Sequence, residues 1–540
     1  MPFTSIPFDV HDIPFGSNGV SNFFWPIAPR EVAAVRGATM NGLRRLMSLP
    51  INLDGLHPDL TSALLPALIS ETLDLFEEQA LSVRSSRSGL AASSKGTLIP
   101  PRAGQSISDS PLIRQMRIGP QASMSAWMKT RRMLANRRTS WQLNDRSVSA
   151  FLPFNRTRDI VTIQANLPLI RAHALTTSSF VRMVGNASWF SPVGHKHMGS
   201  SPRASGDWAD QVISAMAQGL EAAGESLNSD QIHYLQRFLP TLSSLASWHL
   251  NKLSEKPGLP MEFWTGSGVG IWSRMLRHAV RRTGARVIGH DHGPGGNHFA
   301  SDYPYLELAA CDAHVTFTAS AAQALREANA QYRPVGISGP EIIALPVENS
   351  TSRLPTYGQA ISSPNSRRPQ KLRIMYTSSF YKGRLSGRPR SWIPDIASLD
   401  WEARLFSKLN GWGFEVIHKP HPGSSNLPIG LAERFGGITL TSPFEDVMEK
   451  ADAFIVLSLS SSIIPALLSS GKPVVYVETD LRTLTPTAQS LLARRCAIVQ
   501  GSFDYENRLQ VDWDQFHKAI EDANHLIDSS FSEFYWGARI

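Results

Sequence analysis

From Met261 onward, hydrophobic and polar positions follow one repeating pattern. Short apolar runs, typical of buried strands, alternate with longer stretches in which apolar residues recur at helical spacing. The first series includes MEFWT, ARVIGH and DAHVTF, and the pattern restarts after residue 370 with KLRIMYT, FEVIHK, DAFIVL and KPVVYV. Strands that alternate with helices predict parallel sheets covered by helices. We therefore expect an α/β protein with two Rossmann-like domains that face a cleft.

Ahead of this pattern the chain is largely helical. Residues 58–81 carry a strong helical pattern, and further helices are expected near 204–223 and 229–254. A stretch rich in Ser, Gly and Pro at 84–110 is typical of a linker. The expected segments are an N-terminal region without assigned chemistry at 1–110, a first Rossmann-like half with helical insertions at 111–347, a linker at 348–370 and a second Rossmann-like half at 371–540.

Composition narrows the class of protein. A chain of 540 residues is too long for one core, and 42% hydrophobic with 18% charged residues is typical of a soluble globular protein. The two cysteines, Cys311 and Cys496, exclude a disulfide framework and a cysteine-rich zinc site. The first residues lack a signal-peptide pattern, and no apolar run reaches the ~18 residues of a membrane span. We therefore expect a cytoplasmic protein.

The positive charge points to an anionic partner. The formal net charge is +8, and much of the excess lies in WMKTRRMLANRRTSW at 127–141, which is predicted to form a basic amphipathic helix. This helix has three open interpretations: it could present a solvated face while covering another helix, it could contact an anionic membrane, or it could contact nucleic acid. We expect no nucleic-acid partner. A membrane contact would make the protein peripheral at the inner face of the cytoplasmic membrane.

A run of serines follows one strand of the second series. The strand ends near Leu457, and a helix is expected to begin at Ser461 or Ser462 and to stop at Gly471, because Pro465 fits only the first turn of a helix. Free backbone amides, hydroxyl groups and the helix dipole would then converge near Ser460, Ser461 and Ser462. This arrangement predicts a phosphate site, and the alternative is a serine run that merely caps the helix.

The preceding strand ends in a histidine between two prolines. In HKPHP, Pro420 and Pro422 enclose His421 in a stiffened turn. Because parallel strands end at one edge of a sheet, His421 and the serine run are expected to face the same ligand. A histidine beside a diphosphate can donate a charge-assisted hydrogen bond to a bridging or leaving oxygen. We therefore predict that His421 binds the donor phosphate and takes part in catalysis.

A second histidine-rich loop, VIGHDHGPGGNHF at 287–299, ends a strand of the first series. A transferase needs a base for its acceptor hydroxyl, and an imidazole or carboxylate on this side of the cleft would supply one. Two alternatives stay open, which are zinc ligation and a structural cluster; the zinc ligands would be His290, His292 and His298.

The stretch HKPHP, followed by SPFEDVMEKADAFIVLSLSSSIIPALLSSGKPVVYV, resembles the nucleotide-binding half of GT-B glycosyltransferase-like proteins. The most similar families are CDP-glycerol glycerophosphotransferases and capsule or surface-carbohydrate transferases that use CMP-activated acidic sugars such as Kdo and sialic acid. The resemblance covers roughly residues 260–480. It implies a GT-B-like fold, in which an HP-type motif and a serine-rich loop hold the donor phosphate.

Carried over residue by residue, the resemblance assigns several roles. It places His421 and Pro422 in the HP motif and Ser460–Ser462 in the phosphate loop, and it matches His292 and the glycine after it to a His-Gly element. We favour His292 as the acceptor base, with Asp291 second. The families carry an Asp before the serine pair where this chain has Leu459, so Glu445 is the substitute for a nucleotide contact. The alternative for Glu445 is an acid that stabilises the first turn of its helix.

These observations together predict a metal-independent glycosyltransferase without a cofactor. It would transfer a sugar or sugar-like group from a nucleotide-activated donor, CMP or CDP, to a cell-surface polysaccharide or a lipid-linked acceptor. One alternative is a nucleotide-sugar 2-epimerase, which has the same two-domain fold. The other is a non-catalytic scaffold for assembly of the cell envelope.

Overall fold

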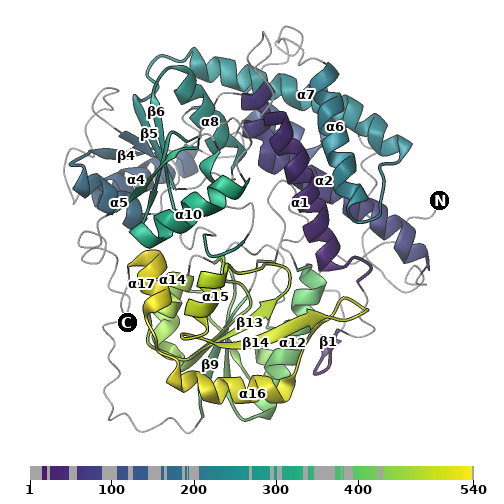
Figure 1. Cartoon of the computed structure of the whole chain (residues 1–540), viewed down its shortest axis with the longest axis vertical. Coiled ribbons are helices and arrows are strands. Elements are labelled where there is room, and N and C mark those ends of the chain that lie inside the picture. The colour runs from purple at the N-terminus through teal and green to yellow at the C-terminus, as the bar shows by residue number, and fades with distance from the viewer. Residues whose placement is uncertain are drawn as a thin grey trace.

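Two parallel sheets carry the fold in the computed structural model of the chain (Figure 1). The structure describes residues 15–20, 25–47, 57–87, 106–119, 126–143, 160–162, 167–184, 189–190, 192–193, 206–266, 270–291, 297–300, 307–309, 311–332, 339–345, 371–378, 380–381, 393–422, 424, 430–461 and 463–537. The predicted α/β class with parallel sheets is confirmed. No helix among these residues is both long and apolar enough to cross a bilayer.

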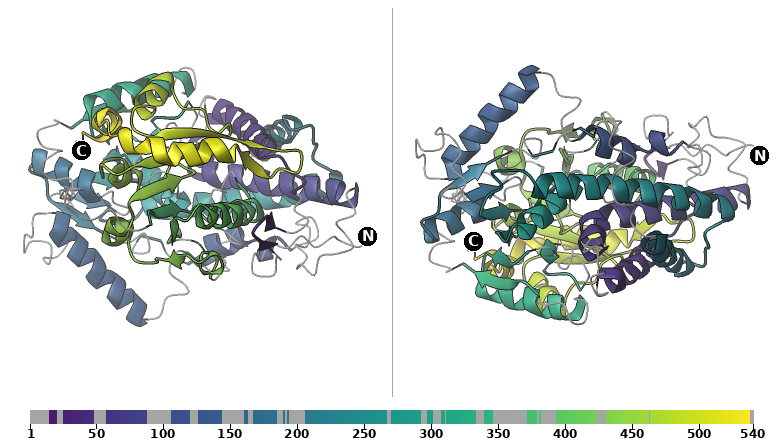
Figure 2. Two further views of the ribbon diagram at one scale, coloured as in Figure 1. Left: turned by 90° about the horizontal axis from the view of Figure 1, so that it is seen from below. Right: turned by 90° about the horizontal axis from the view of Figure 1, so that it is seen from above.

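The first sheet has six strands in the order β4-β3-β5-β6-β7-β8, and every neighbouring pair is parallel. The strands are β3 (Ile160–Thr162), β4 (Val181–Met183), β5 (Glu262–Thr265), β6 (Arg286–His290), β7 (Ala313–Thr316) and β8 (Glu341–Ala344). The helices beside them are α4 (Ala126–Leu143), α5 (Leu167–Thr176), α8 (Ile271–Arg282) and α10 (Ala319–Tyr332). Helix α4 contacts β4 and α5 and stands out from the body of the molecule, as Figure 2 shows.

A group of helices packs together beside α8. They are α1 (Pro29–Met47), α2 (His57–Arg87), α3 (Pro111–Ile118), α6 (Gly206–Glu221) and α7 (Ser229–Ser254), with a short 3-10 turn at Ile107–Asp109. The predicted helices at 58–81, 204–223 and 229–254 are therefore confirmed. Helices α1 and α6 can approach closely because Gly42 has no side chain. A Cβ at this position would lie 2.7 Å from the Cβ of Ala215. Helix α7 starts at a capping box between Asn228 and Gln231.

The second sheet has seven strands in the order β11-β10-β9-β12-β13-β14-β15, and only the pair β14 and β15 is antiparallel. The strands are β9 (Arg373–Thr377), β10 (Glu415–Lys419), β11 (Ile438–Thr439), β12 (Ala453–Val456), β13 (Val474–Thr479), β14 (Ala497–Phe503) and β15 (Leu509–Val511). Its α-helices are α12 (Asp395–Gly411), α13 (Phe444–Val447), α14 (Ile464–Leu468), α15 (Pro486–Leu492), α16 (Trp513–Asp522) and α17 (Ser530–Trp536). Short 3-10 turns lie at Glu433–Phe435, Met448–Lys450 and Ala523–His525.

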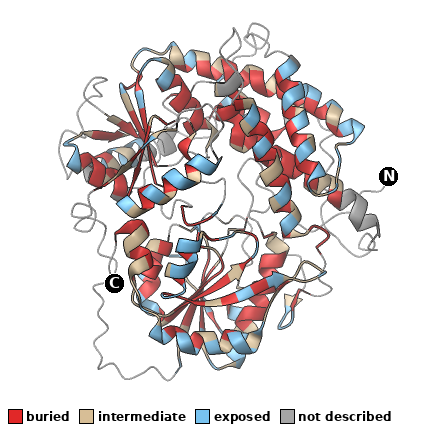
Figure 3. Cartoon of the chain, in the orientation of Figure 1, coloured by how far each residue is buried: buried red, intermediate tan, exposed pale blue. Residues whose placement is uncertain are grey.

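The central strands are mostly buried, as the red arrows in Figure 3 show. Strands β7 and β12 have no exposed residue, which explains why their sequences are continuous apolar runs rather than alternating ones. Each of the two large hydrophobic clusters contains residues from both sheets. The two sheets are therefore parts of one packed body.

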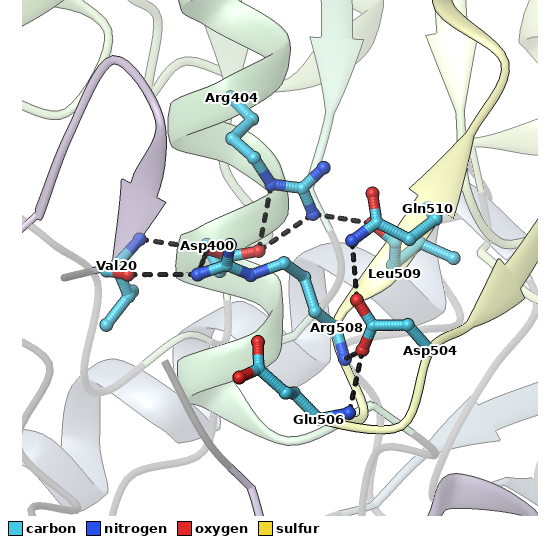
Figure 4. A network of polar contacts seen from close by, with 8 residues as sticks. All are labelled: Val20, Asp400, Arg404, Asp504, Glu506, Arg508, Leu509 and Gln510. Carbon is cyan, nitrogen blue, oxygen red and sulfur yellow. Dashed lines mark hydrogen bonds and ion pairs between the residues drawn. The ribbon is translucent and has the colours of Figure 1, made fainter. Parts of the chain in front are cut away.

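A buried carboxylate joins the N-terminal hairpin to the second sheet (Figure 4). The hairpin consists of β1 (Phe15–Gly16) and β2 (Gly19–Val20), and the amide of Val20 donates to Asp400 on α12 at 2.9 Å. Asp400 is fully buried; the guanidinium of Arg404 donates to it at 2.7 Å, and that of Arg508 lies 3.3 Å away. A Cβ on Gly19 would lie 2.1 Å from Asp400, so only glycine fits at that turn.

We expect Asp400→Asn to destabilise the protein. The variant leaves Arg404 and Arg508 without the carboxylate between them, and removing one partner of a buried ion pair costs about 3–5 kcal/mol. The free energy of unfolding, measured by urea denaturation, should fall by that amount. A matched control is Glu449→Gln, which breaks an exposed ion pair with Lys472 and should cost less than about 1 kcal/mol. Equal losses in the two variants would contradict this account of the hairpin.

Candidate functional site

The strand order of the second sheet reverses at β9. From β9 the chain moves outward to β10 and β11, and it then returns to the other side of β9 to form β12 and β13. In an open α/β sheet, ligands bind outside the carboxyl ends of the strands where the order reverses. The loops that follow β9, β10 and β12 start from this edge, and they contain His421 and the serine run.

His421 lies in a turn that is tied to the loop after β9. The amide of Ser378 donates to the carbonyl of Lys419 at 3.0 Å, and the amide of Tyr381 donates to the hydroxyl of Ser424 at 3.1 Å. The half-buried ring of His421 stands edge-on to Phe380, with ring centroids 5.1 Å apart. Contacts from the ends of both β9 and β10 thus fix the position of the imidazole, as expected for a group that binds a ligand.

The serine run is placed at this edge, but the helix after it differs from the prediction. Helix α14 begins at Ile464 rather than at Ser461 or Ser462, and it ends at Leu468 rather than at Gly471. Pro465 does lie in the first turn, as predicted, and the preceding residues form turns instead. A helix of five residues has only a small dipole, so the expectation of a helix N-terminus as the phosphate site is corrected.

The serines themselves remain available as hydrogen-bonding groups. The hydroxyls of Ser458 and Ser460 lie 2.8 Å apart. Ser460 is exposed and Ser461 is half-buried, while Ser462 lies outside the described residues. Any anion held here would therefore contact hydroxyl and amide groups of the loop rather than the end of a long helix.

Sequence reasoning missed Lys419 at the same edge. Its side chain is 5% exposed, and its ammonium group donates to the carbonyl of Pro420 at 3.0 Å. Burial lowers the pKa of Lys419, and the negative charge of Glu445 opposes that shift. Glu445 is itself exposed in the first turn of α13. The lysine within HKPHP was a visible signal, because a basic residue at a buried strand end needs an anionic partner.

A buried polar cluster lies beneath the loops after β9 and β10. Glu402 on α12 is fully buried and accepts a hydrogen bond from the hydroxyl of Tyr381 at 3.0 Å. Its Oε2 lies 3.7 Å from Nε2 of His418, which also contacts the hydroxyl of Ser378. Burial raises the pKa of Glu402 to about 8 and lowers the pKa of His418 to about 3. Both groups are therefore neutral near pH 7, as a dry site requires.

At the carboxyl end of β6, the side chains of His290 and Asp291 point into the interior. Asp291 is buried, and its carboxylate accepts a hydrogen bond of 3.0 Å from the side-chain Nδ2 of Asn297, so residues 291 and 297 are joined. Next to it, buried His290 shares a hydrogen bond of 2.9 Å with His173, whose ring stacks on Trp264. His292 lies outside the described residues. Asp291 thus joins the described residues on either side of segment 292–296.

A third histidine supports Asp291 from the neighbouring strand. Nε2 of His314 lies 3.9 Å from the Asp291 carboxylate. Burial alone would lower the pKa of His314, but contact with Asp291 and Cys311 raises it to about 9. Among the residues that the structure describes, no three His, Cys, Asp or Glu side chains are grouped so that they could hold a metal ion.

The histidine loop continues directly into a contact with the second sheet. Phe299 forms an antiparallel bridge with Leu484, and the amide of Ala300 donates to the carbonyl of Thr483 at 2.8 Å. The segment from Thr483 to Thr485 follows β13, so it starts from the carboxyl edge of the second sheet. Buried His298 packs nearby against Phe531 of α17. The carboxyl end of β6 is therefore connected to the edge that carries His421.

Comparisons with known proteins add no assignment. No protein-family model matches the chain, and a search of curated proteins found no match.

We expect the buried carboxyl group of Glu402 to make stability depend on pH. Its pKa is about 8 in the folded protein against 4.5 for an ordinary glutamate. The folded state therefore holds a proton that the unfolded state releases, and this contribution is complete below pH 4.5 and is lost as the pH rises to about 8. Between about pH 6.5 and 8 the loss is on the order of 2 kcal/mol.

Glu402→Gln should flatten this dependence while keeping an acceptor for Tyr381. The groups that face Glu402 are Tyr376, Ser378, Tyr381, His418 and, at longer range, Asp395. His418 and His314 are present in both proteins, so their contributions cancel when the two curves are compared. Urea denaturation at several pH values gives the two curves, with Glu445→Gln as an exposed control. Parallel curves for wild type and Glu402→Gln would refute the assignment.

Proposed function

We propose that the protein is a GT-B-like glycosyltransferase whose two sheets belong to Rossmann-like domains on either side of a cleft. The observation that carries the proposal is that His421 and Lys419 at the end of β10, and the serine run after β12, stand at one edge of the sheet on either side of β9, where the strand order reverses. Parallel α/β sheets bind nucleotides at such a point. The donor would be a sugar or sugar-like group activated by CMP or CDP.

The side chains at this edge suit a phosphate group. His421 can donate to a phosphate oxygen, Lys419 can supply positive charge, and the hydroxyls of Ser460 and Ser461 can donate further hydrogen bonds. Glu445 lies close enough to Lys419 to affect its pKa. Its carboxylate could accept a hydrogen bond from a ribose hydroxyl of the same nucleotide.

The acceptor would bind on the side of the histidine loop. His292 would take the proton from the acceptor hydroxyl, and Asp291 would hold the loop through Asn297. The bond between the acceptor oxygen and the sugar carbon forms as the bond from that carbon to the donor phosphate oxygen breaks. The electron pair leaves with the phosphate, whose growing charge is stabilised by His421 and Lys419. No step requires a metal or a cofactor.

The acceptor is proposed to be a cell-surface polysaccharide or a lipid-linked precursor, with the transfer taking place in the cytoplasm. Support for two domains that face each other comes from the link between the loop after β6 and the loop after β13. The link joins residues that follow β6 to residues that follow β13, and transfer between two bound substrates would need the carboxyl edges of both sheets to face a common region.

We expect His421→Ala to lower turnover ~10²- to 10³-fold, because it removes one donor to the charge that develops on the leaving phosphate. Affinity for CMP and CDP should change much less. Calorimetry gives the affinity, and release of nucleotide from a CMP-sugar gives turnover. The control is His233→Ala, an exposed histidine on α7. If His421→Ala mainly unfolds the protein and keeps normal activity per folded molecule, the prolines fix a structural turn and the proposal fails.

His292→Ala should have an effect of a different kind. It should leave nucleotide affinity unchanged and abolish transfer to the acceptor, since the residue is proposed to act on the acceptor hydroxyl. Release of nucleotide to water should persist at a low rate. A loss of CMP and CDP affinity in His292→Ala, with an unchanged melting temperature, would place this loop at the donor and contradict the assigned roles.

A further inference from the structure

Helix α4 presents an exposed face that combines apolar and basic side chains. Met133 and Leu134 are 48% and 56% exposed, and they are the only adjacent pair among the large hydrophobic residues exposed in the described part of the chain. One turn further along, Arg137 and Arg138 are also exposed. Residues at i and i+4 share one side of a helix. These four side chains therefore form one surface, which we call the α4 face.

The last turn of the helix attaches it to the protein. Ser140 and Leu143 are buried, and the hydroxyl of Ser140 accepts a hydrogen bond from the amide of Met183 on β4 at 2.8 Å. The attachment lies at the C-terminal end of the helix, and Figure 2 shows the remainder standing away from the body. The α4 face is thus held in a fixed orientation without being covered by another described element.

The charge of the helix is entirely of one sign. Ala126–Leu143 contains five basic residues and no acidic one, and these are Lys129, Arg131, Arg132, Arg137 and Arg138. Among the arginine ion pairs of the described residues, none involves Arg137 or Arg138. A surface helix that only meets water usually mixes both charges. An uncompensated positive face indicates an anionic partner.

We infer that the α4 face docks on an anionic lipid bilayer. The two arginines would contact lipid phosphates, and Met133 and Leu134 would enter the boundary between headgroups and acyl chains. Nucleic acid fits less well because its phosphate backbone offers nothing to two exposed aliphatic side chains. A second copy of this chain fits less well because docking would bring like charges together. This surface lies beside the first sheet and does not depend on the proposed nucleotide site.

Vesicle sedimentation with the full chain tests the inference. We expect binding to vesicles of phosphatidylcholine and phosphatidylglycerol mixed two to one, and much weaker binding to phosphatidylcholine alone. Arg137→Gln/Arg138→Gln should weaken binding to the anionic vesicles about thirtyfold, because each basic residue near such a surface contributes about 1 kcal/mol. The matched control, Arg237→Gln/Lys518→Gln, removes the same charge from exposed positions on α7 and α16 and should bind normally.

A second variant separates a membrane from nucleic acid. Met133→Ser/Leu134→Ser keeps the charge, and it should weaken vesicle binding while leaving any binding to duplex DNA unchanged. All substituted residues are exposed, so melting temperatures should match that of the wild type. Equal binding to both kinds of vesicle, equal losses in the arginine variant and its control, or unchanged vesicle binding of the serine variant would each overturn the inference.

Discussion

All strands of a parallel sheet end at the same edge, and this constraint decides where the second sheet can bind a ligand. The chain leaves β9 in one direction to form β10 and returns on the other side to form β12. Three loops that are far apart in sequence therefore start from the same edge. Every polar group that we assign to the phosphate lies on one of these loops or beside them, and their supporting contacts follow from the same geometry.

The support beneath the site is made of groups that water cannot reach. Glu402, His418 and Tyr381 form a buried cluster between α12 and the two strand ends. Because the interior is dry, each group is kept neutral and each is held by a neighbour. Such a cluster costs more to assemble than an apolar one. It is therefore consistent with selection for a fixed loop geometry rather than for stability alone.

The periodicity of the chain was enough to predict the class of fold and several helices, since burial of continuous apolar runs and helical spacing are local signals. Helix α7 begins where it was expected because its capping box is formed by residues close together in the sequence, Asn228 and Gln231. Helix α14 did not match, because turns at the serine run compete with the helix and the sequence does not show which wins. The sequence does not reveal the roles of Lys419, Glu402 and Asp400, because each role depends on a partner that is not adjacent in the chain.

The hairpin on Asp400 also has a consequence for the order of events during synthesis. The amide of Val20 finds its acceptor 380 residues later in the chain. At translation rates of about 5–20 residues per second, the hairpin leaves the ribosome roughly 20 to 80 s before that acceptor exists. Arg508, which closes the contact, appears later still. The strands of this hairpin are thus among the last described elements to reach their native place, so their backbone hydrogen-bonding groups stay without the native acceptor for most of synthesis.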